Sequence, residues 1–293
     1  MIREETLYLS FPEWQGSGKS NELYHGANFL RSSLAAQFPF KQIHVSPTDC
    51  SEIENGILGY KEILKQKTAA KELVRMLNPQ RIFTLGGSCG VETMPISFLN
   101  HVHDHLAIIW FDAHADLNTP ESSPSKHFHG MPLRLLLGEG DRTLCELLFS
   151  TLKLEQVFLA GVRDTDLEER ELISSHKIFT ASPDQIDSIV AAVESAGFRK
   201  IYVHIDLDVL DPNHFSGVKC PTHGGLTLDQ LCGTLLQLRL AFEVVGFSIL
   251  EFVPDKGNSL QQVDPINKII SAVSWESEKH VRSDFSGFSL MDS

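Results

Sequence analysis

Three side chains of metal-ligand type follow one apolar run of the sequence. Residues 108–111 are wholly apolar, and Asp112, His114 and Asp116 come directly after them, spaced by alanines. Residues two apart in an extended segment point to the same side, so two carboxylates and an imidazole converge. Oxygen and nitrogen ligands of this kind suit a divalent cation. One Asp-x-His-x-Asp alone fits a polar loop after a buried strand equally well.

A second pair of carboxylates has the same two-residue spacing. Asp206 and Asp208 follow the strand-like run 200–205 and add two more ligands on one side of a neighbouring strand. Buried acids in such number repel one another unless cations neutralise them. The whole set suits two metals that share carboxylates, and a metal-bridging hydroxide is a nucleophile near neutral pH.

The elements that must position these residues alternate between strand and helix. Strand-like runs are expected at 41–45, 81–85, 108–111, 156–162, 178–180, 200–205 and 244–252. Apolar residues at helical spacing predict helices at 21–36, 56–77, from 91, 130–138, after 166, 183–197, from 227 and 260–275. Residues 1–20 have no clear periodicity and no visible chemistry.

This alternation predicts an α/β fold with a mainly parallel sheet covered by helices on both faces. Such folds bind ligands at the carboxyl ends of their strands. The polar clusters obey that rule, since predicted strands end at Cys89, residues 112–116, 164–166, 206–208 and Glu251. Unrelated polar loops would not be expected to lie consistently at the carboxyl ends of predicted strands.

The size and composition of the chain limit its function classes. Its 293 residues are expected to form a single domain, residues 1–293. A net charge of -13 repels phosphate backbones and argues against nucleic-acid binding. Because no apolar run could span a bilayer and no signal peptide is visible, a cytoplasmic protein without a membrane partner is expected. The 5 irregularly spaced cysteines are unlike a secreted disulfide framework.

Six short motifs and Glu251, taken together, resemble the arginase/agmatinase family of ureohydrolases. The motifs are Gly-Gly-x-x at 86–89, Asp-Ala-His-Ala-Asp at 112–116, Asn-Thr-Pro at 118–120, His-Gly-x-Pro at 129–132, Asp-x-Asp-x-x-Asp-Pro at 206–212 and Gly-Gly-Leu-Thr at 224–227. They occur in the family's order, and their joint occurrence is far more specific than any one of them.

The resemblance implies a three-layer α/β/α sandwich, a binuclear manganese site and a small guanidino or amidine substrate. It makes Asp112 and Asp206 the ligands that bridge the two metals. One metal then adds Asp116, and the other adds His114 and Asp208. The family also suggests a homo-oligomer, either a trimer or a hexamer.

The resemblance also implies the catalytic residues of a hydrolase that cleaves a C–N bond and releases urea. His129 occupies the position of a proton shuttle, which the departing amine needs. Glu251 occupies that of the carboxylate that pairs with the substrate guanidinium. Asp116 can orient the hydroxide by a hydrogen bond.

The chain departs from the family at one metal ligand. The first motif usually reads Gly-Gly-Asp-His, with the histidine on a metal, and here it ends in Ser88-Cys89. Thiolate is a soft ligand that favours zinc or iron over manganese. Cys89 is therefore compatible with a thiolate-ligated binuclear site, with a single well-bound metal, or with a catalytically silent protein that binds or regulates. Cys89 as a small buried residue that touches no metal is a separate alternative.

The substrate loop matches arginases only in part. Asn118 and Ser125 stand where arginases contact the substrate carboxylate, and Asp166 where they contact its amino group. His127 replaces an asparagine, and binds a carboxylate when protonated, carries a second proton, or has no function. An amino-acid-like substrate is plausible, whereas arginine itself is not established. A related metal-dependent deacetylase is a weaker alternative.

Overall fold

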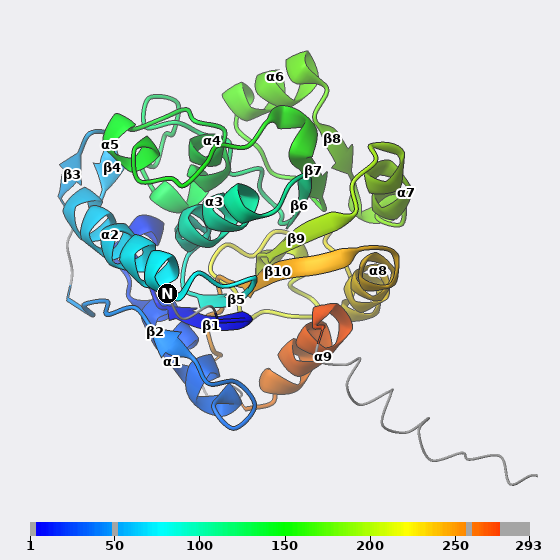
Figure 1. Ribbon diagram of the computed structural model, residues 1–293, viewed down its shortest axis with the longest axis horizontal. Helices are drawn as coiled ribbons and strands as arrows, with labels where there is room; N and C mark the ends of the chain where they lie inside the picture. The colour runs from blue at the N-terminus through cyan, green and yellow to red at the C-terminus, as the bar shows by residue number, and fades with distance from the viewer. Residues whose placement is uncertain (1–3, 49–51, 256–259, 276–293) are drawn as a thin grey trace, which may run out of the picture.

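A computed structural model of the protein describes residues 4–48, 52–255 and 260–275. At its centre lies an eight-stranded sheet in the order β2-β1-β5-β10-β9-β6-β7-β8, whose hydrogen-bonded neighbours are all parallel (Figure 1). Its strands are β1 (Thr6–Phe11), β2 (Lys41–Gln42), β5 (Arg81–Gly86), β6 (Leu106–Phe111), β7 (Val157–Ala160), β8 (Phe179–Ala181), β9 (Lys200–Ile205) and β10 (Glu243–Ile249). A separate antiparallel hairpin consists of β3 (Ile53–Glu54) and β4 (Ile57–Leu58).

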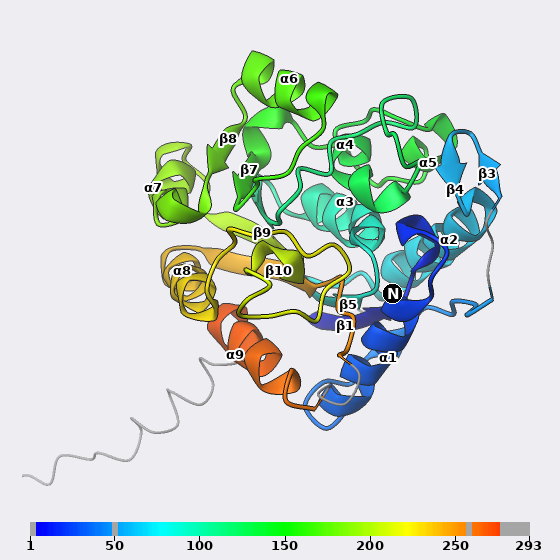
Figure 2. The same ribbon diagram turned by 180° about the vertical axis from the view of Figure 1, so that it is seen from behind.

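Helices cover both faces of the sheet, as the two opposite views show (Figure 1, Figure 2). One hydrophobic cluster includes α7 (Ser188–Ser195), α8 (Leu228–Ala241) and α9 (Val263–Val273), and a second includes α2 (Tyr60–Leu77), α3 (Thr93–Val102) and α4 (Pro132–Leu136). Three further helices are α1 (Glu22–Leu34), α5 (Arg142–Cys145) and α6 (Leu167–His176). This arrangement confirms the predicted three-layer α/β/α sandwich. No helix in the described ranges is both long and apolar enough to cross a membrane.

Strand β6 illustrates how the sequence builds this sandwich. Its side chains alternate between the two hydrophobic clusters, with Ile109 and Phe111 in one and Ile108 and Trp110 in the other. Because a strand between two helical layers is buried on both faces, apolar side chains dominate it, and in β6 they occupy every position. The first polar side chain therefore appears where the strand ends, at Asp112.

The prediction that residues 1–20 hold no regular element was wrong. Residues Thr6–Phe11 form β1, which pairs with β5 along its whole length. Leu7, Leu9 and Phe11 are fully buried. They alternate with less apolar residues, so the period-two signal of a strand was present in the sequence.

Several predicted boundaries also differ from the structure. The strand expected at 41–45 has only two residues, and the strand expected at 244–252 ends at Ile249. A 3-10 helix, η2 (Cys89–Glu92), precedes α3 where an α-helix was expected from residue 91. At the carboxyl edge of the sheet, Glu251 therefore lies after the end of β10, and Cys89 lies at the start of a 3-10 helix.

Gly87 allows the N-terminal segment to approach the turn after β5. A Cβ atom at Gly87 would lie 1.9 Å from the carbonyl oxygen of Glu13. Since that oxygen accepts a hydrogen bond from the Ser88 N–H at 2.8 Å, it cannot move away freely. We expect Gly87→Ala to lower the free energy of unfolding by about 1–3 kcal/mol, as overpacking does. Equilibrium denaturation with urea measures this change.

Gly233→Ala is the matched control for this substitution. Gly233 is exposed on α8, and a Cβ atom there would have no neighbour within 4 Å. Alanine is favoured over glycine inside a helix by about 1 kcal/mol, so the control should be at least as stable as the wild type. Equal stability of the two variants would contradict the close approach at Gly87.

Candidate metal centre

Two neighbouring strands bring the acidic motifs to one edge of the sheet. Strands β6 and β9 pair in register with Phe111 opposite Ile205, so the next residues, Asp112 and Asp206, leave the sheet together. The N–H of Asp206 donates to the Phe111 carbonyl at 2.9 Å. Because the two strands are parallel, the two motifs meet at the carboxyl edge, as the sequence predicted.

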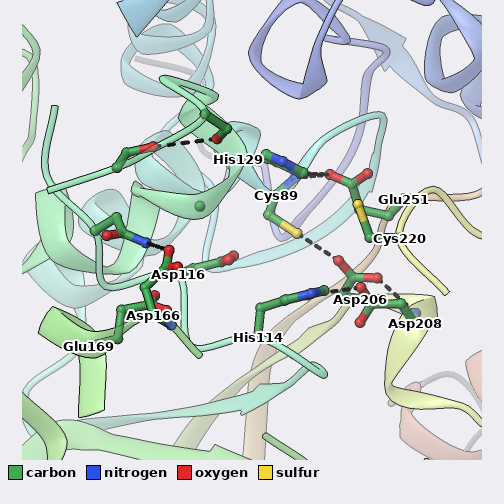
Figure 3. A pocket seen from close by; sticks show the side chains of 14 residues that line it. Cys89, His114, Asp116, His129, Asp166, Glu169, Asp206, Asp208, Cys220 and Glu251 are labelled. Carbon is green, nitrogen blue, oxygen red and sulfur yellow. Dashed lines mark hydrogen bonds and ion pairs between the residues drawn. The ribbon is translucent and has the colours of Figure 1, made fainter. Parts of the chain in front are cut away.

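A cavity of about 160 Å³ opens at this edge (Figure 3). The predicted site residues that line it are Cys89, His114, Asp116, Asn118, Ser125, His129, Asp166, Asp206, Asp208 and Glu251. Asp112 is fully buried beneath this wall, and His127 is not part of it. None of the described lining residues is a lysine or arginine, so the imidazoles of His114 and His129 are the basic side chains that this wall offers to its carboxylates.

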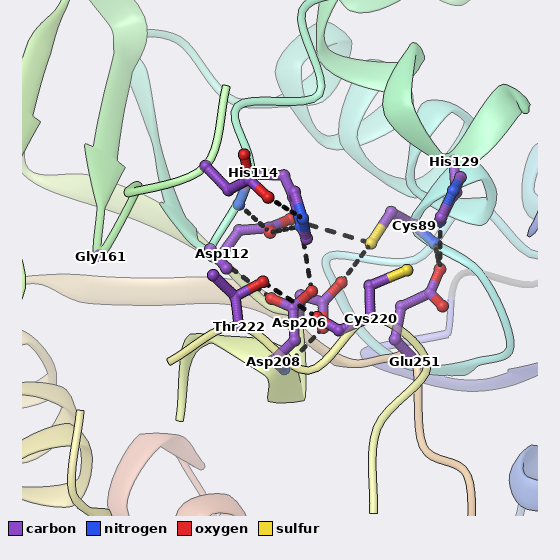
Figure 4. Close-up of polar contacts among 12 residues, drawn as sticks. Cys89, Asp112, His114, His129, Gly161, Asp206, Asp208, Cys220, Thr222 and Glu251 are labelled. Atoms are coloured by element: carbon purple, nitrogen blue, oxygen red, sulfur yellow. Dashed lines mark hydrogen bonds and ion pairs between the residues drawn. The ribbon is translucent and has the colours of Figure 1, made fainter. Parts of the chain in front are cut away.

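His114 lies between two carboxylates from different strands (Figure 4). Its Nδ1 atom is 3.3 Å from Asp112 Oδ1 and 3.0 Å from Asp208 Oδ2. Asp208 is fixed in turn by the Ala113 N–H, which donates to its Oδ1 at 3.0 Å. Burial opposes charge on His114, but hydrogen bonds that the imidazole donates to the Asp112 and Asp208 carboxylates outweigh it and raise its pKa well above the usual range.

Cys89 lies inside the acidic cluster and not in a remote part of the core. Its Sγ atom is 3.0 Å from Asp206 Oδ2 and 4.0 Å from Asp112 Oδ2. The side chain of Ser88 caps η2 by accepting from the Gly90 N–H, which fixes the position of Cys89. Burial, followed by the Asp206 carboxylate, raises the pKa of the Cys89 thiol well above its usual range. A cation bound by thiolate must therefore displace this proton.

The carboxylates of Asp116, Asp206 and Asp208 are crowded together, and ionisation of each one is disfavoured by burial and by its neighbours. Burial, followed by neighbouring carboxylates, raises the pKa of Asp116 and Asp206 well above the usual range. The same causes raise the pKa of Asp208 to about 6. Asp116 Oδ2 is buried and has no hydrogen-bond partner among the described residues. Such an orphaned oxygen is what a bound cation would satisfy.

The donor atoms form overlapping groups that fit a divalent cation. Three sets have all their donor atoms within 4.8 Å of one another: Cys89, Asp112, Asp116 and His204; Cys89, Asp206 and Glu251; and Asp112, His114 and Asp208. Asp112 belongs to the first and third sets, and Cys89 to the first and second. Because shared donors join neighbouring sets, the residues fit more than one divalent cation, with Asp112 as a shared ligand. Asp206 shares a set with Cys89 and Glu251 and not with Asp112, so its bridging role stays a prediction.

Glu251 and His129 form the wall opposite the aspartates (Figure 3). Glu251 Oε1 accepts from the Cys89 N–H at 3.1 Å and lies 3.3 Å from His129 Nδ1. Its other oxygen, Oε2, is buried without a hydrogen-bond partner in the described structure. A left-handed backbone, with φ of 59°, places Glu251 directly after β10. This carboxylate is therefore positioned to accept hydrogen bonds from a bound group.

The predicted substrate-binding residues divide into two groups. Asn118 and Asp166 are hydrogen-bonded to each other, from Nδ2 to Oδ2 at 2.9 Å, and both line the cavity together with Ser125. The ring of His127 instead packs beside Gly18, 3.3 Å from the place of an added Cβ atom. It lies 5.7 Å from the ring of His129, measured between centroids. His127 is thus half-buried and outside the set of residues that line the cavity, and its contact with a substrate stays a prediction.

Several residues at the site were missed by the sequence analysis. Glu169 and Cys220 line the cavity, Ser17 donates to Glu251 Oε1 at 3.3 Å, and His204 lies beside Asp112. Glu169 and Ser17 stand in segments with no metal-ligand spacing, so nothing local identified them. His204 had a signal, because His204-x-Asp206-x-Asp208 repeats the alternation of the first motif.

Comparisons with known proteins cover most of the chain. The family model described as Arginase family matches residues 21–272. The chain is 33% identical to the arginase of Staphylococcus aureus (strain MRSA252) over 226 residues. This aligned segment covers 72% of this chain and 75% of that arginase. Among solved structures, Entamoeba histolytica arginase in complex with L-ornithine has a TM-score of 0.80 at 20% identity, covering 93% and 99% of the two chains. Native Bacillus caldovelox arginase has a TM-score of 0.76 at 22% identity, covering 99% and 100%.

Proposed function

Because this chain belongs to the arginase family, we propose that it is a metal-dependent hydrolase that cleaves a C–N bond of a small guanidino or amidine compound and releases urea. One observation supports this most strongly. Buried carboxylates, an imidazole and a thiol converge at a cavity whose described wall contains no lysine or arginine. Such a cluster has a deficit of positive charge, which cations and a cationic substrate would supply.

In this proposal two cations share the buried aspartates. Cys89, Asp112, Asp116 and Asp206 would hold one cation, and Asp112, His114, Asp206 and Asp208 the other. When bound, such cations lower the pKa of a coordinated water and supply a nucleophile near neutral pH. Manganese is the family's metal, whereas the sulfur of Cys89 favours zinc or ferrous iron.

Glu251 would bind the substrate guanidinium. Its Oε2 atom is buried and unpartnered among the described residues, so it is available to a donor in the cavity. A guanidinium presents several N–H donors in one plane, which a carboxylate accepts in pairs. The pairing would hold the guanidino carbon facing the aspartates on the opposite wall.

His129 and Asp116 would handle the protons of the reaction. Water adds to the guanidino carbon, and Asp116 Oδ2 would accept a hydrogen bond that orients it. The bond from that carbon to the substituted nitrogen then breaks, and His129 would give the departing amine its proton. The His129 side chain is 21% exposed, so it can exchange protons with solvent.

The size and the lining of the cavity limit the choice of substrate. The volume of the whole cavity, about 160 Å³, is below the range typical of sites for drug-sized ligands, so a small substrate fits. Asn118 and Asp166 present polar groups there and would bind an amino-acid-like end, together with Ser125. Arginine and other guanidino acids are therefore the compounds to test first.

Elemental analysis combined with an assay of urea release tests the proposal. Protein purified without chelators and offered manganese, zinc or ferrous iron should retain two cations per chain. The loaded protein should release urea and an amine in equal amounts from at least one guanidino compound, and chelation should abolish this. Failure to retain any cation would refute the proposal. Two retained cations without hydrolysis would favour the catalytically silent alternative.

The homo-oligomer and the cytoplasmic location stay predictions.

A further inference from the structure

A fully buried imidazole lies directly beneath the metal centre. His204 is in β9, two residues before Asp206, so its side chain is on the same side of the strand. It stacks on Trp110, its partner in the neighbouring strand, with ring centroids 3.5 Å apart and an interplanar angle of 8°. None of its surface is exposed. The ring is therefore held in one orientation.

The Nε2 atom of this ring is directed at the ligand cluster. It lies 3.4 Å from Asp112 Oδ2, and it belongs to a set with Cys89, Asp112 and Asp116 whose donor atoms are all within 4.8 Å of one another. Two donors that each lie about 2.1 Å from a four-coordinate cation are separated by about 3.4 Å. The spacing between His204 and Asp112 is thus the spacing of two ligands of one cation.

A carboxylate faces the other ring nitrogen. Nδ1 lies 3.5 Å from Glu92 Oε2, within ion-pair distance but without a hydrogen bond among the described residues, and both side chains are fully buried. Glu92 is fixed by two hydroxyl donors, Tyr202 to Oε1 and Ser248 to Oε2, each at 3.1 Å. Metal-binding imidazoles commonly donate their second N–H to a carboxylate, which sets the tautomer and the ring orientation. Glu92 is the carboxylate placed for this role, and a closer approach of the ring would leave the lone pair of Nε2 facing the cluster.

We propose that His204 is a further metal ligand, which binds one cation through Nε2 together with Cys89, Asp112 and Asp116. The inference rests on the proposed function, in which Asp112 and Asp206 are shared with the second cation. A sulfur and an imidazole nitrogen among the carboxylate oxygens favour zinc or ferrous iron over manganese. His204 would thus supply an imidazole ligand at the site where Cys89 stands in place of the family's usual histidine.

A crystal structure of the zinc-loaded wild type tests the assignment directly. Zinc should lie about 2.0–2.1 Å from His204 Nε2, the usual zinc–imidazole distance, and should be located by anomalous scattering. A cation bound by Cys89 and Asp112 but more than about 3 Å from Nε2 would overturn the assignment. His204 would then only orient Asp112 by a hydrogen bond. Absence of any zinc would refute this assignment, and only a failure to retain manganese and ferrous iron as well would refute the proposed function.

Zinc affinities of variants provide a second measurement. In His204→Gln, one of the two zinc sites should weaken by more than about 100-fold while the other is unchanged. Glu92→Gln removes only the outer partner and should weaken the same site by about 10–100-fold. His103→Gln is the matched control, since His103 is also buried but contacts Gln80 at the opposite edge of the sheet. Wild-type affinity at both sites of His204→Gln would refute the inference and leave the proposed function intact.

Discussion

Replacement of Asp112 by alanine should remove the bound cations and with them the hydrolysis of guanidino compounds. The two oxygens of Asp112 face different donor groups, which is why the loss should affect both metals. Oδ1 lies 3.3 Å from His114 Nδ1, whereas Oδ2 lies 3.4 Å from His204 Nε2 and 4.0 Å from Cys89 Sγ. A carboxylate with one oxygen toward each group can bridge two cations.

The expected effect of Asp112→Ala is large. Metal content should fall from two cations to fewer than one per chain, as measured by elemental analysis after removal of free metal. The value of kcat/KM should fall by at least about 10³-fold, because a catalytic cation contributes several kcal/mol and each 1.36 kcal/mol is a factor of ten. Circular dichroism verifies that the variant is folded.

Asp164→Ala is the matched control for this experiment. Asp164 Oδ2 lies 4.0 Å from His114 Nε2, so the residue is in the same neighbourhood, but its side chain is 66% exposed. An exposed acid contributes little to a buried cation, so metal content and activity should stay near the wild-type values. If Asp112→Ala kept both cations, the bridging role would be refuted.

The positions of the metal-ligand residues were predictable from the sequence because local rules determine them. Strand β6 is buried on both faces and wholly apolar, so its first polar residue, Asp112, marks its end. Parallel strands end at the same edge, so Asp206 had to lie near Asp112 once the alternation of strand and helix was recognised. The left-handed backbone at Glu251 was not visible, but the place of this residue near the carboxyl end of the last strand was.

The contribution of the N-terminal segment was not predictable in this way. Ser17 donates to Glu251, which is 234 residues away in the chain, and Ser88 donates to the carboxylate of Glu13. These contacts exist because β1 inserts beside β5, and no spacing within residues 1–20 encodes that pairing. His204 is a different case, because its two-residue spacing from Asp206 was visible but was interpreted as part of the strand core.

Glu251→Gln should leave the cations bound while guanidino hydrolysis is lost. Oε1 of Glu251 is 3.1 Å from the Cys89 N–H, and an amide oxygen can still accept this bond. The variant therefore retains the shape of the wall and loses only a negative charge. A buried guanidinium without its carboxylate partner loses about 3–5 kcal/mol, so kcat/KM should fall by about 10²–10⁴-fold.

The comparison with Glu251→Asp separates charge from shape. Aspartate keeps the negative charge but is one methylene shorter, so it should retain more activity than glutamine if the charge binds the substrate. Urea release is measured on the guanidino compound that the wild type hydrolyses best, with metal content determined in parallel. Full turnover by Glu251→Gln with two bound cations would show that the substrate cation binds elsewhere. Loss of metal from this variant would instead make Glu251 a ligand, since its carboxylate and Cys89 belong to one donor group. The outcome therefore decides whether this wall of the cavity recognises the substrate or completes the metal centre.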